Sequence, residues 1–293
     1  MALFPEDLNI THRTDVYPGI DLNGRLRDAA KGKVVYITGA SRGIGAATAL
    51  AYAQAGAKGL FLSSTSRSAS DLQKVRDSIK TAIPDVEVHT CAVDVNDEKV
   101  VKESVDECIQ KFGKIDVVIA NAGYLEKWAN IGDIDPAEWW RSMEVSIRGT
   151  FNVVHHTVKH LVETKGYVLL LSSIAAQLRG PGASAYSVAK HALNRFAEFI
   201  DVEYRAQGVK VFSVHPGGVV TVLSSNEPTL PELLHDKVEL PAHSMVRLTS
   251  GSEDWLAGRY VSCQWDFDVL QTKRKEIEEA DLLKNRLDIG TLG

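Results

Sequence analysis

The chain has little cysteine, and none of it is arranged for covalent or metal-based stabilisation. Only three cysteines occur in 293 residues, Cys91, Cys108 and Cys263, and no pair has the C-x-x-C spacing. Reduced thiols in an intracellular protein are therefore expected rather than disulfides. The first residues contain acids and Pro5 where a signal peptide needs a basic and then an apolar run. An apolar run of about 18 residues, the length of a membrane span, is also missing, so we predict a cytoplasmic protein.

Positive charge is not concentrated anywhere in the sequence. The chain has 33 lysines and arginines against 38 aspartates and glutamates, a net charge of −5, and it contains no tract of five basic residues. Nucleic acids and anionic membranes bind such tracts, so neither is an expected partner.

Hydrophobic residues make up 44% of the chain, which is ordinary for a globular protein with a large core.

Short apolar runs alternate with helical patterns along most of the chain. The predicted strands are 33–40, 59–64, 86–95, 115–123, 166–173, 210–218 and an edge strand within 258–267. The predicted helices are 43–56, 68–83, 97–113, 136–164 and 185–207. Alternation of this kind is typical of βαβ units. The runs are continuous rather than alternating, as expected for strands with helices on both faces. The prediction is an α/β fold with a doubly wound parallel sheet (Rossmann-type) in a single domain.

The ends of the chain depart from this pattern. Residues 1–32 show no clear period and are predicted to be an extension lying over the body, with the catalytic domain at 33–270 and a charged helix and tail at 271–293. Within the domain, residues 220–250 mix prolines, leucines and histidines after the sixth strand. Ligands bind at the carboxyl ends of such strands, so this segment is predicted to be a substrate lid; an ordinary surface loop with a short helix is the alternative.

The first strand ends in a glycine-rich turn, Thr38-Gly39-Ala40-Ser41-Arg42-Gly43-Ile44-Gly45. Glycines let a backbone approach a diphosphate closely, and the helix that follows offers free N–H groups and the positive end of its dipole. The spacing is G-x-x-x-G-x-G, so a simple tight turn is the alternative. The candidate cofactor contacts here are Gly39, Ser41, Arg42, Gly43, Ile44 and Gly45.

The end of the second strand bears on the choice of nicotinamide cofactor. A carboxylate there would bind the ribose 2′-hydroxyl, whereas a basic residue would accept a 2′-phosphate. This strand ends with Ser64 and is followed by Arg67, without a carboxylate, and Arg42 is a second candidate. NADP is therefore expected and NAD less so, unless both arginines are only surface charges. Asp94 and Val95 end the third strand, where they would meet the adenine.

Tyr186 and Lys190 lie four residues apart at the start of a predicted helix, which places them side by side on one face. A nearby ammonium favours the phenolate form of a tyrosine, whose pKa is otherwise about 10. Such a pair would make the tyrosine able to exchange protons, although Y-x-x-x-K is also common by chance. Ser173 ends the preceding strand, and its hydroxyl could hold a substrate carbonyl.

Together with the glycine turn, Asn121-Ala122-Gly123 at the end of the fourth strand and PGGVVT at 216–221, these residues resemble the short-chain dehydrogenase/reductase family over about residues 33–265. The resemblance implies that Tyr186 is the general acid/base and that Lys190 lowers its pKa and binds the nicotinamide ribose. It implies that Ser173 orients the substrate. The residues expected near the nicotinamide are Pro216, Gly217, Val219 and Thr221.

One position departs from the family pattern. The family has an asparagine in the long helix, which is thought to hold a water linking the lysine to solvent, and this chain has Ser146. A serine hydroxyl can still donate and accept hydrogen bonds through water, so Ser146 is a candidate fourth member of the catalytic group.

The resemblance implies an NADP(H)-dependent oxidoreductase that interconverts a ketone and a secondary alcohol. The tail GRYVSCQWD is similar to that of fungal members, which suggests a substrate from secondary metabolism, polyketide- or terpenoid-like. Tyr124, Leu125 and Trp128 suggest a bulky, mostly apolar ligand, although core aromatics are the alternative. A homodimer or homotetramer through 136–164 and 185–207 is implied, and no metal is expected at His155, His156 and His160.

Two other functions remain open at this point. The first is a dinucleotide-binding sensor or scaffold without redox turnover, for which Ser146 is the only support. The second is an enzyme that keeps the cofactor but catalyses a cyclisation or epimerisation without net redox change.

Overall fold

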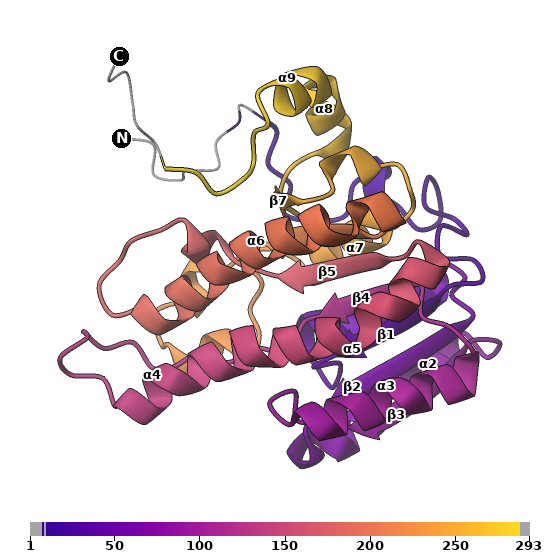
Figure 1. The fold of residues 1–293 in the computed structure, drawn as a ribbon, viewed down its shortest axis with the longest axis horizontal. Helices are drawn as coiled ribbons and strands as arrows, with labels where there is room; N and C mark the ends of the chain where they lie inside the picture. Colours follow the sequence, from indigo (N-terminus) through magenta and orange to yellow (C-terminus); the bar gives the residue numbers. More distant parts are fainter. Residues whose placement is uncertain (1–7, 9, 288–293) are drawn as a thin grey trace.

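The computed structural model describes residues 8 and 10–287, which form one parallel sheet with helices on both faces (Figure 1). The strands are β1 (Val34–Thr38), β2 (Gly59–Ser64), β3 (Glu87–Ala92), β4 (Val117–Ala120), β5 (Tyr167–Leu171), β6 (Lys210–His215) and β7 (Arg259–Ser262). Their order is β3-β2-β1-β4-β5-β6-β7, and each neighbouring pair is parallel. The predicted doubly wound sheet is confirmed.

Two groups of helices enclose the sheet. The helices are α1 (Gly43–Gln54), α2 (Ala69–Ala82), α3 (Glu98–Phe112), α4 (Pro136–Met143), α5 (Gly149–Thr164), α6 (Ser184–Tyr204), α7 (Glu239–Leu248), α8 (Phe267–Thr272) and α9 (Arg274–Glu279). One apolar cluster joins α1, α2 and α7 to one face of the sheet. A second cluster joins α3, α5 and α6 to the other face. The region predicted as one helix, 136–164, consists of α4 and α5 joined by a π-helical turn at Glu144–Arg148.

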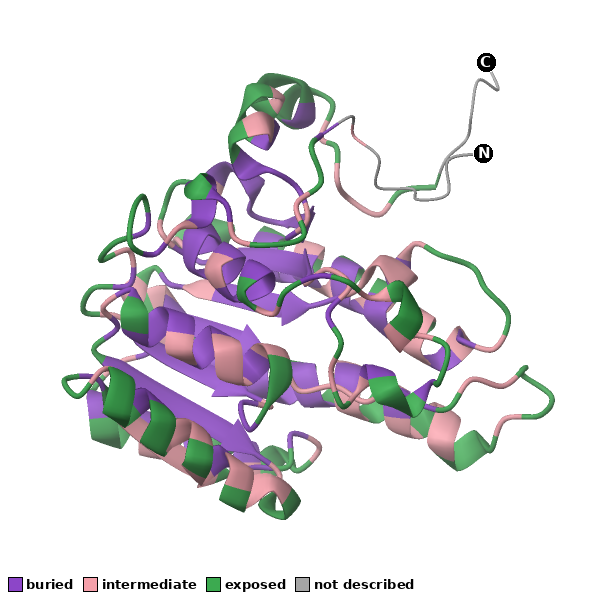
Figure 2. Ribbon diagram, turned by 180° about the vertical axis from the view of Figure 1, so that it is seen from behind, coloured by how far each residue is buried: buried purple, intermediate pink, exposed green. Residues whose placement is uncertain are grey.

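Burial of the strands explains their continuous apolar runs. All residues of β1 are buried, and successive side chains enter opposite clusters. Val35 and Ile37 join the cluster of α1, whereas Val34 and Tyr36 join the cluster of α3. Figure 2 shows the sheet as a buried layer beneath helices whose outer sides are exposed. A strand covered on both faces needs apolar side chains at every position, which is the pattern seen in the sequence.

The described part of the N-terminal region packs against the body of the domain. Its buried apolar side chains join the cluster of α1 and α7, and they are Ile10, Tyr17, Ile20, Leu22, Leu26 and Ala30. His12 forms an antiparallel bridge with Trp265, and Arg13 Nη2 lies 2.7 Å from Asp266 Oδ2. Lys237 N donates to Thr14 O at 2.8 Å. The first described residues therefore contact elements near the end of the chain.

The segment predicted as a lid, 220–250, has two different parts. Residues 239–248 form α7, where Leu240, Met245 and Leu248 are fully buried against α1. This part belongs to the core. Residues 219–238 have only short helical turns and carry exposed apolar side chains, including Val222.

The charged C-terminal region contains less helix than the sequence suggests. Helix α9 ends at Glu279, although the charged pattern extends over 273–287. Beyond it, Leu283 O accepts a hydrogen bond from Tyr260 N of β7 at 2.9 Å, and Asn285 O accepts one from Arg195 of α6 at 2.6 Å. The tail thus lies along the sheet edge and α6. Within residues 8 and 10–287, no helix has the length and apolarity of a membrane span.

Candidate active site

The glycine turn lies at the carboxyl end of β1, where the strand order reverses between β1 and β4 and where ligands bind in such sheets. Gly39 and Gly43 have φ values of +66° and +55°, which favour glycine. A Cβ at Gly45 would lie 2.4 Å from Gly39 O. Arg42 precedes α1 and provides no side-chain cap, so no side chain of the cap residue covers the first amides of α1. The turn therefore presents uncapped N–H groups to the carboxyl edge of the sheet.

Hydrogen bonds join the ends of β1 and β4. Thr38 Oγ1 accepts from Asn121 N at 3.1 Å and from Ala122 N at 3.0 Å. Asn121 Nδ2 donates to Thr38 O at 2.9 Å and to Gly39 O at 3.1 Å. The Asn121-Ala122-Gly123 turn is thus held directly beside the glycine turn.

The two arginines considered for a phosphate lie close to this edge. Arg67 is in a short 3-10 turn directly after β2, and Arg42 is in the glycine turn; both side chains are exposed. The hydrogen bond and charge of Lys74 lower the pKa of Asp71, and the nearby Arg42 adds a smaller lowering. Among the residues that the structure describes, neither guanidinium makes a hydrogen bond or an ion pair. Ser64 is buried at the end of β2.

The other predicted adenine contacts follow β3. Asp94 Oδ1 accepts from Asn96 N at 3.0 Å, and Val95 is buried. Val95 O accepts from Asn152 Nδ2 of α5 at 2.9 Å, and a Cβ at Gly149 would lie 2.4 Å from Val95 Cγ2. The close approach of α5 fixes the position of this loop.

The proposed catalytic side chains come together from two elements. Ser173 follows β5, and its hydroxyl is hydrogen-bonded to Tyr186 in the first turn of α6. Lys190, one turn later, has its Nζ 5.4 Å from the centre of the Tyr186 ring. That Nζ would lie 3.7 Å from a Cβ at Gly123, so the lysine reaches the turn after β4. The three side chains therefore share one location beside the carboxyl ends of β4 and β5.

Burial dominates the proton affinities of this pair. Burial raises the pKa of Tyr186 to about 12, and the hydrogen bond with Ser173 acts in the opposite direction. Burial also lowers the pKa of Lys190 to about 8. Lys190 Nζ donates to Leu171 O at 2.6 Å, which anchors the ammonium at the end of β5. Burial is thus the largest influence on the pKa of Tyr186, and the hydrogen bond with Ser173 is the influence that lowers it.

Buried polar residues fix the elements that carry the site. His215 Nδ1 accepts from Ile174 N at 3.2 Å, directly after Ser173, and burial lowers the pKa of His215 to about 4. The imidazole therefore stays neutral and keeps this acceptor. Asn194 Oδ1 of α6 accepts from Ser172 Oγ at 2.6 Å and from Ser213 Oγ at 2.5 Å. These bonds hold α6 against β5 and β6.

Ser146 lies in the π-helical turn between α4 and α5 and is fully buried. Its Oγ has no hydrogen-bond partner among the described residues. Turns of this kind are frequent at functional sites, and a buried hydroxyl without a protein partner is typically hydrogen-bonded to water.

The predicted nicotinamide-binding segment follows β6 and lies against the glycine turn. A Cβ at Gly43 would lie 3.3 Å from Thr221 Cγ2. Gly217 has a φ of +92°, and Asp236 Oδ2 accepts from Gly218 N at 2.6 Å and from Gln264 Nε2 at 2.8 Å. Pro216 is half-buried and Val219 is buried, where Val219 forms a bridge with Asp236.

Segment 219–238 also contacts the loop after β4. Asn226 Nδ2 donates to Leu125 O at 3.0 Å, and Glu227 Oε2 accepts from Trp128 N at 3.4 Å. These two contacts place the segment over the loop that leads away from Gly123. Tyr124 is hydrogen-bonded to Glu138 of α4.

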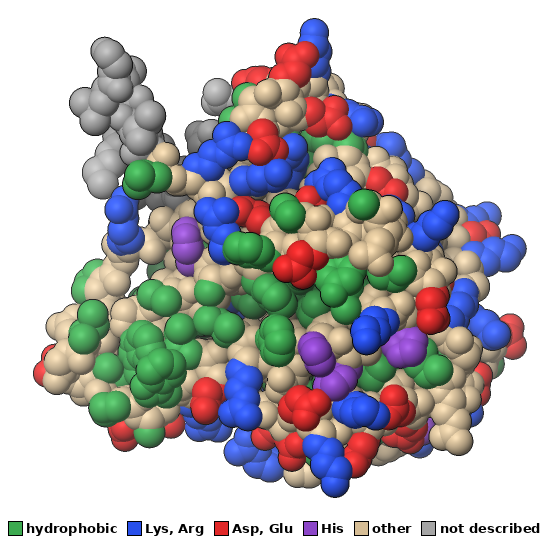
Figure 3. Space-filling view, viewed as in Figure 1, with side chains coloured by type: hydrophobic (Ala, Val, Ile, Leu, Met, Phe, Trp, Pro, Cys, Tyr) green, Lys and Arg blue, Asp and Glu red, His purple; other side chains and the backbone are tan. Residues whose placement is uncertain are grey.

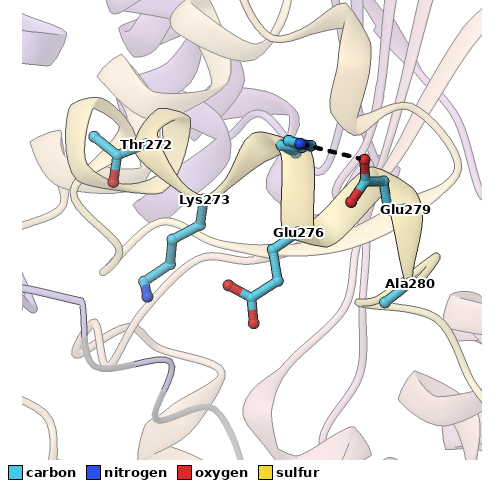
Figure 4. Close-up of a pocket in the computed structure, with 6 residues that line it drawn as sticks. Thr272, Lys273, Glu276, Glu279 and Ala280 are labelled. Atoms are coloured by element: carbon cyan, nitrogen blue, oxygen red, sulfur yellow. Dashed lines mark ion pairs between the residues drawn. The ribbon is translucent and has the colours of Figure 1, made fainter.

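The histidines of α5 are not arranged as a metal site. His156 Nε2 lies 2.6 Å from Glu98 Oε1, and the His155 ring stacks on Phe151. Within the described ranges, no group of three or more metal-ligating side chains is present. A hollow beside α8 and α9 is lined mainly by polar and charged side chains, with an ion pair between Lys275 and Glu279, and contains none of the proposed site residues (Figure 4).

Sequence reasoning did not single out three residues that shape the site. Thr38 could have been noticed, because a hydroxyl residue directly precedes the glycine turn. No sequence pattern marks Asn194 or Glu126, because their roles arise from contacts with elements distant in sequence. Glu126 is fully buried in the loop after β4 and accepts a hydrogen bond from Tyr186 N at 3.1 Å.

The chain is similar to known proteins over most of its length. Residues 33–230 match the family model described as short chain dehydrogenase. The short chain dehydrogenase mpl6 of Monascus purpureus is 40% identical over 281 residues, which cover 94% of each chain. The short chain dehydrogenase pigC of Monascus ruber is 34% identical over 290 residues, covering 95% of this chain and 93% of that protein.

Solved structures show the same fold. Levodione reductase superposes with a TM-score of 0.73 at 26% identity, covering 81% of this chain and 96% of that one. Carveol dehydrogenase from Mycobacterium avium, in complex with NAD, gives a TM-score of 0.73 at 21% identity and covers 80% of this chain and 96% of that one. The chain therefore belongs to the short-chain dehydrogenase/reductase family of oxidoreductases, which bind a nicotinamide dinucleotide.

Proposed function

We propose that this enzyme is an NADP(H)-dependent oxidoreductase that interconverts a ketone and a secondary alcohol. The observation that carries the proposal is the convergence of Ser173, Tyr186 and Lys190 beside the glycine turn and the Asn121-Ala122-Gly123 turn. These groups supply a hydroxyl donor, a proton-exchanging phenol and a cation at one place. Family membership supports redox use of that arrangement.

The glycine turn suits a dinucleotide. A Cβ at Gly45 would collide with Gly39 O and would lie 2.7 Å from Asn121 Nδ2, so the turn is tightly closed around backbone groups. The uncapped first amides of α1 point out of it, where a diphosphate would accept their hydrogen bonds. Pro216, Gly217, Val219 and Thr221 would contact the nicotinamide end. When bound, the dinucleotide supplies or accepts the hydride.

The remaining chemistry belongs to the chain itself. In reduction, Tyr186 Oη donates its proton to the carbonyl oxygen of the ketone, and in oxidation it takes the proton from the alcohol. Ser173 Oγ, already hydrogen-bonded to Tyr186, holds the same oxygen. Lys190 places a cation near the phenolate formed in reduction and would hold the nicotinamide ribose. The buried Ser146 Oγ would bind a water through which the proton reaches solvent.

The preference for NADP(H) rests on two cations near the end of β2. Arg42 and Arg67 are exposed, and neither has an ion-pair partner among the described residues, so both can bind a 2′-phosphate. The replacement Arg67→Ala is expected to reduce kcat/KM for NADPH about tenfold and to leave kcat/KM for NADH nearly unchanged. The same result is expected for Arg42→Ala. Equal loss with both cofactors would contradict the NADP(H) assignment.

The substrate is proposed to be bulky and mostly apolar. Apolar side chains on segment 219–238 are exposed, among them Val220, Val222 and Leu233. This segment, proposed as the lid, meets Leu125 and Trp128 of the loop after β4. The fungal origin of the relatives is in keeping with a polyketide- or terpenoid-like substrate.

The enzyme is proposed to act in the cytoplasm as a homodimer or homotetramer. Figure 3 shows apolar side chains gathered over α4 and along α5 and α6. The exposed ones are Trp140, Phe151, Val188, Phe199 and Val202. An apolar surface of this kind is typical of a protein interface. Phe199→Asp is expected to reduce the mass of the assembly, measured by sedimentation.

The decisive test is NADPH consumption with aromatic and alicyclic ketones such as 1-tetralone and 2-decalone. Turnover by the wild-type enzyme and its loss in Tyr186→Phe are expected. Binding of NADPH without turnover of any carbonyl, together with no loss of function in the Tyr186→Phe variant, would instead indicate a sensor. Product formation without net change in NADPH would indicate a cyclase or epimerase.

A further inference from the structure

A buried carboxylate lies directly behind the proposed catalytic tyrosine. Glu126 follows β4 by a short loop and is fully buried. Its Oε1 accepts a hydrogen bond from the backbone N of Tyr186 at 3.1 Å, and its Oε2 accepts one from the hydroxyl of Ser142 in α4. A carboxylate removed from water is costly unless hydrogen bonds compensate it. These two bonds are therefore specific features of the site rather than incidental contacts.

The beginning of α6 has no cap of its own. The residue before the helix is Ala183, which has no side-chain acceptor for the free amides of the first turn. Ser187 N is the first amide bonded within the helix, to Ala183 O at 3.1 Å. Glu126 supplies from a different element the acceptor that the helix lacks, and its charge favours the positive end of the helix dipole. The residue whose amide it binds is the tyrosine itself.

The same carboxylate acts on the phenol through its charge. Glu126 raises the pKa of Tyr186, because a second negative charge nearby disfavours the phenolate. Other titratable groups near this loop are Lys190 on α6, Lys127 and Glu227, whose Oε2 accepts from Trp128 N. A cluster at the edge of α4, in which Tyr124 contacts Glu138 and Arg141, also lies nearby. Of the carboxylates in this set, Glu126 is the one bonded to the backbone of α6.

We propose that Glu126 is a positioning residue for Tyr186, holding the first turn of α6 through the amide of the tyrosine and tying it to α4 through Ser142. This inference rests on the proposed role of Tyr186 as general acid/base. The loop after β4 thereby connects three elements of the site: the Asn121-Ala122-Gly123 turn, α4 and the helix that carries the catalytic pair. A displacement of the loop would move the tyrosine.

The test compares Glu126→Gln with Glu126→Ala, using exposed Glu103→Gln as the matched control. The amide oxygen of glutamine can still accept from Tyr186 N, and its NH₂ can donate to Ser142, so Glu126→Gln should retain kcat within about threefold. Without the negative charge, the limb of its pH–rate profile that reports Tyr186 should move about half a pH unit or more to lower pH. Glu126→Ala should lose about tenfold to a hundredfold in kcat with little change in KM for NADPH.

Hydrogen exchange provides a measurement that needs no substrate. Peptides covering 183–190 should exchange faster in Glu126→Ala than in the wild-type enzyme, and Glu126→Gln should restore the protection. Unchanged exchange in Glu126→Ala, or an unshifted pH profile in Glu126→Gln, would overturn the inference. Should Glu126→Ala fail to fold, Ser142→Ala and Glu126→Gln carry the same comparison.

Parallel measurement of Tyr186→Phe separates the two proposals. If that variant keeps its activity, the proposed role of the tyrosine fails. If it is inactive while Glu126→Gln shows no shift of the pH profile, only the role of Glu126 fails.

Discussion

The buried ammonium of Lys190 is expected to make the fold less stable, and its removal should show this directly. The side chain is only 4% exposed, and burial lowers its pKa from 10.5 to about 8. Such a difference corresponds to about 3 kcal/mol of unfolding free energy at neutral pH. Lys190→Met keeps much of the volume but loses the hydrogen bond to Leu171 O, worth about 1–2 kcal/mol. We therefore expect a net gain of about 1–2 kcal/mol at pH 7, together with loss of turnover.

The difference in stability between the wild-type enzyme and Lys190→Met should depend on pH. Because the pKa of Lys190 is lower in the folded chain, the unfolded chain holds more protons between about pH 8 and 10.5. The stability of the wild-type enzyme relative to Lys190→Met therefore rises with pH across this window. Tyr186, with a pKa of about 12, does not titrate there in the folded chain.

The assay is thermal unfolding of both proteins at one protein concentration from pH 7 to 10. An advantage of about 1–2 kcal/mol corresponds to a Tm about 2–3 °C higher for Lys190→Met at pH 7, because a chain of 293 residues has a large entropy of unfolding. The Tm difference in favour of Lys190→Met should disappear by pH 10. Lys275→Met is the control, because its side chain is 86% exposed. A lower Tm for Lys190→Met at pH 7, or a difference that does not vary with pH, would refute the reasoning.

Three further predictions concern the turn, the core and the proposed lid. Gly45→Ala would place a Cβ 2.4 Å from Gly39 O, so calorimetric titration should show NADPH affinity reduced about tenfold or more; unchanged affinity would contradict a tightly closed turn. Glu253→Gln leaves the guanidinium of Arg247, which is 1% exposed, without its buried carboxylate partner at 2.8 Å. Urea unfolding should show a loss of about 2–3 kcal/mol, and a loss below about 1 kcal/mol would argue against this. Asp236→Ala removes two hydrogen bonds at the base of segment 219–238, so KM for the ketone should rise and proteolysis within the segment should accelerate. A protease-resistant segment would exclude that role.

The strands of the sheet could be predicted from the sequence because each strand is marked by the residues within it. The apolar runs at 33–40 and 59–64 correspond to β1 and β2, since strands covered on both faces must be apolar throughout. A helix at the position of α7 was expected only in the alternative to the lid, because Pro241 and His243 resemble a loop. Pro241 lies in the first turn of the helix, where its missing N–H costs nothing, and the buried face of α7 depends on α1.

In the site, too, the sequence predicted contacts within one element but not contacts between elements. The neighbourhood of Tyr186 and Lys190 follows from their spacing on one helix, and the glycine turn follows from its position after a strand. By contrast, Glu126 and His215 are defined by bonds to backbone groups of other elements, at Tyr186 N and Ile174 N. No pattern within a short window contains those contacts, so only the folded chain reveals them.

The contacts between the two ends of the chain have a consequence for biosynthesis. Asp266 N donates to Thr11 O, and Arg13 pairs with Asp266 across 253 positions of sequence. Thr11 and Arg13 therefore obtain these partners only after translation has passed residue 266. Until then, the apolar side chains of residues 10–30, among them Tyr17 and Ile20, lack part of the surface that covers them, which makes nascent chains of this enzyme candidates for chaperone binding.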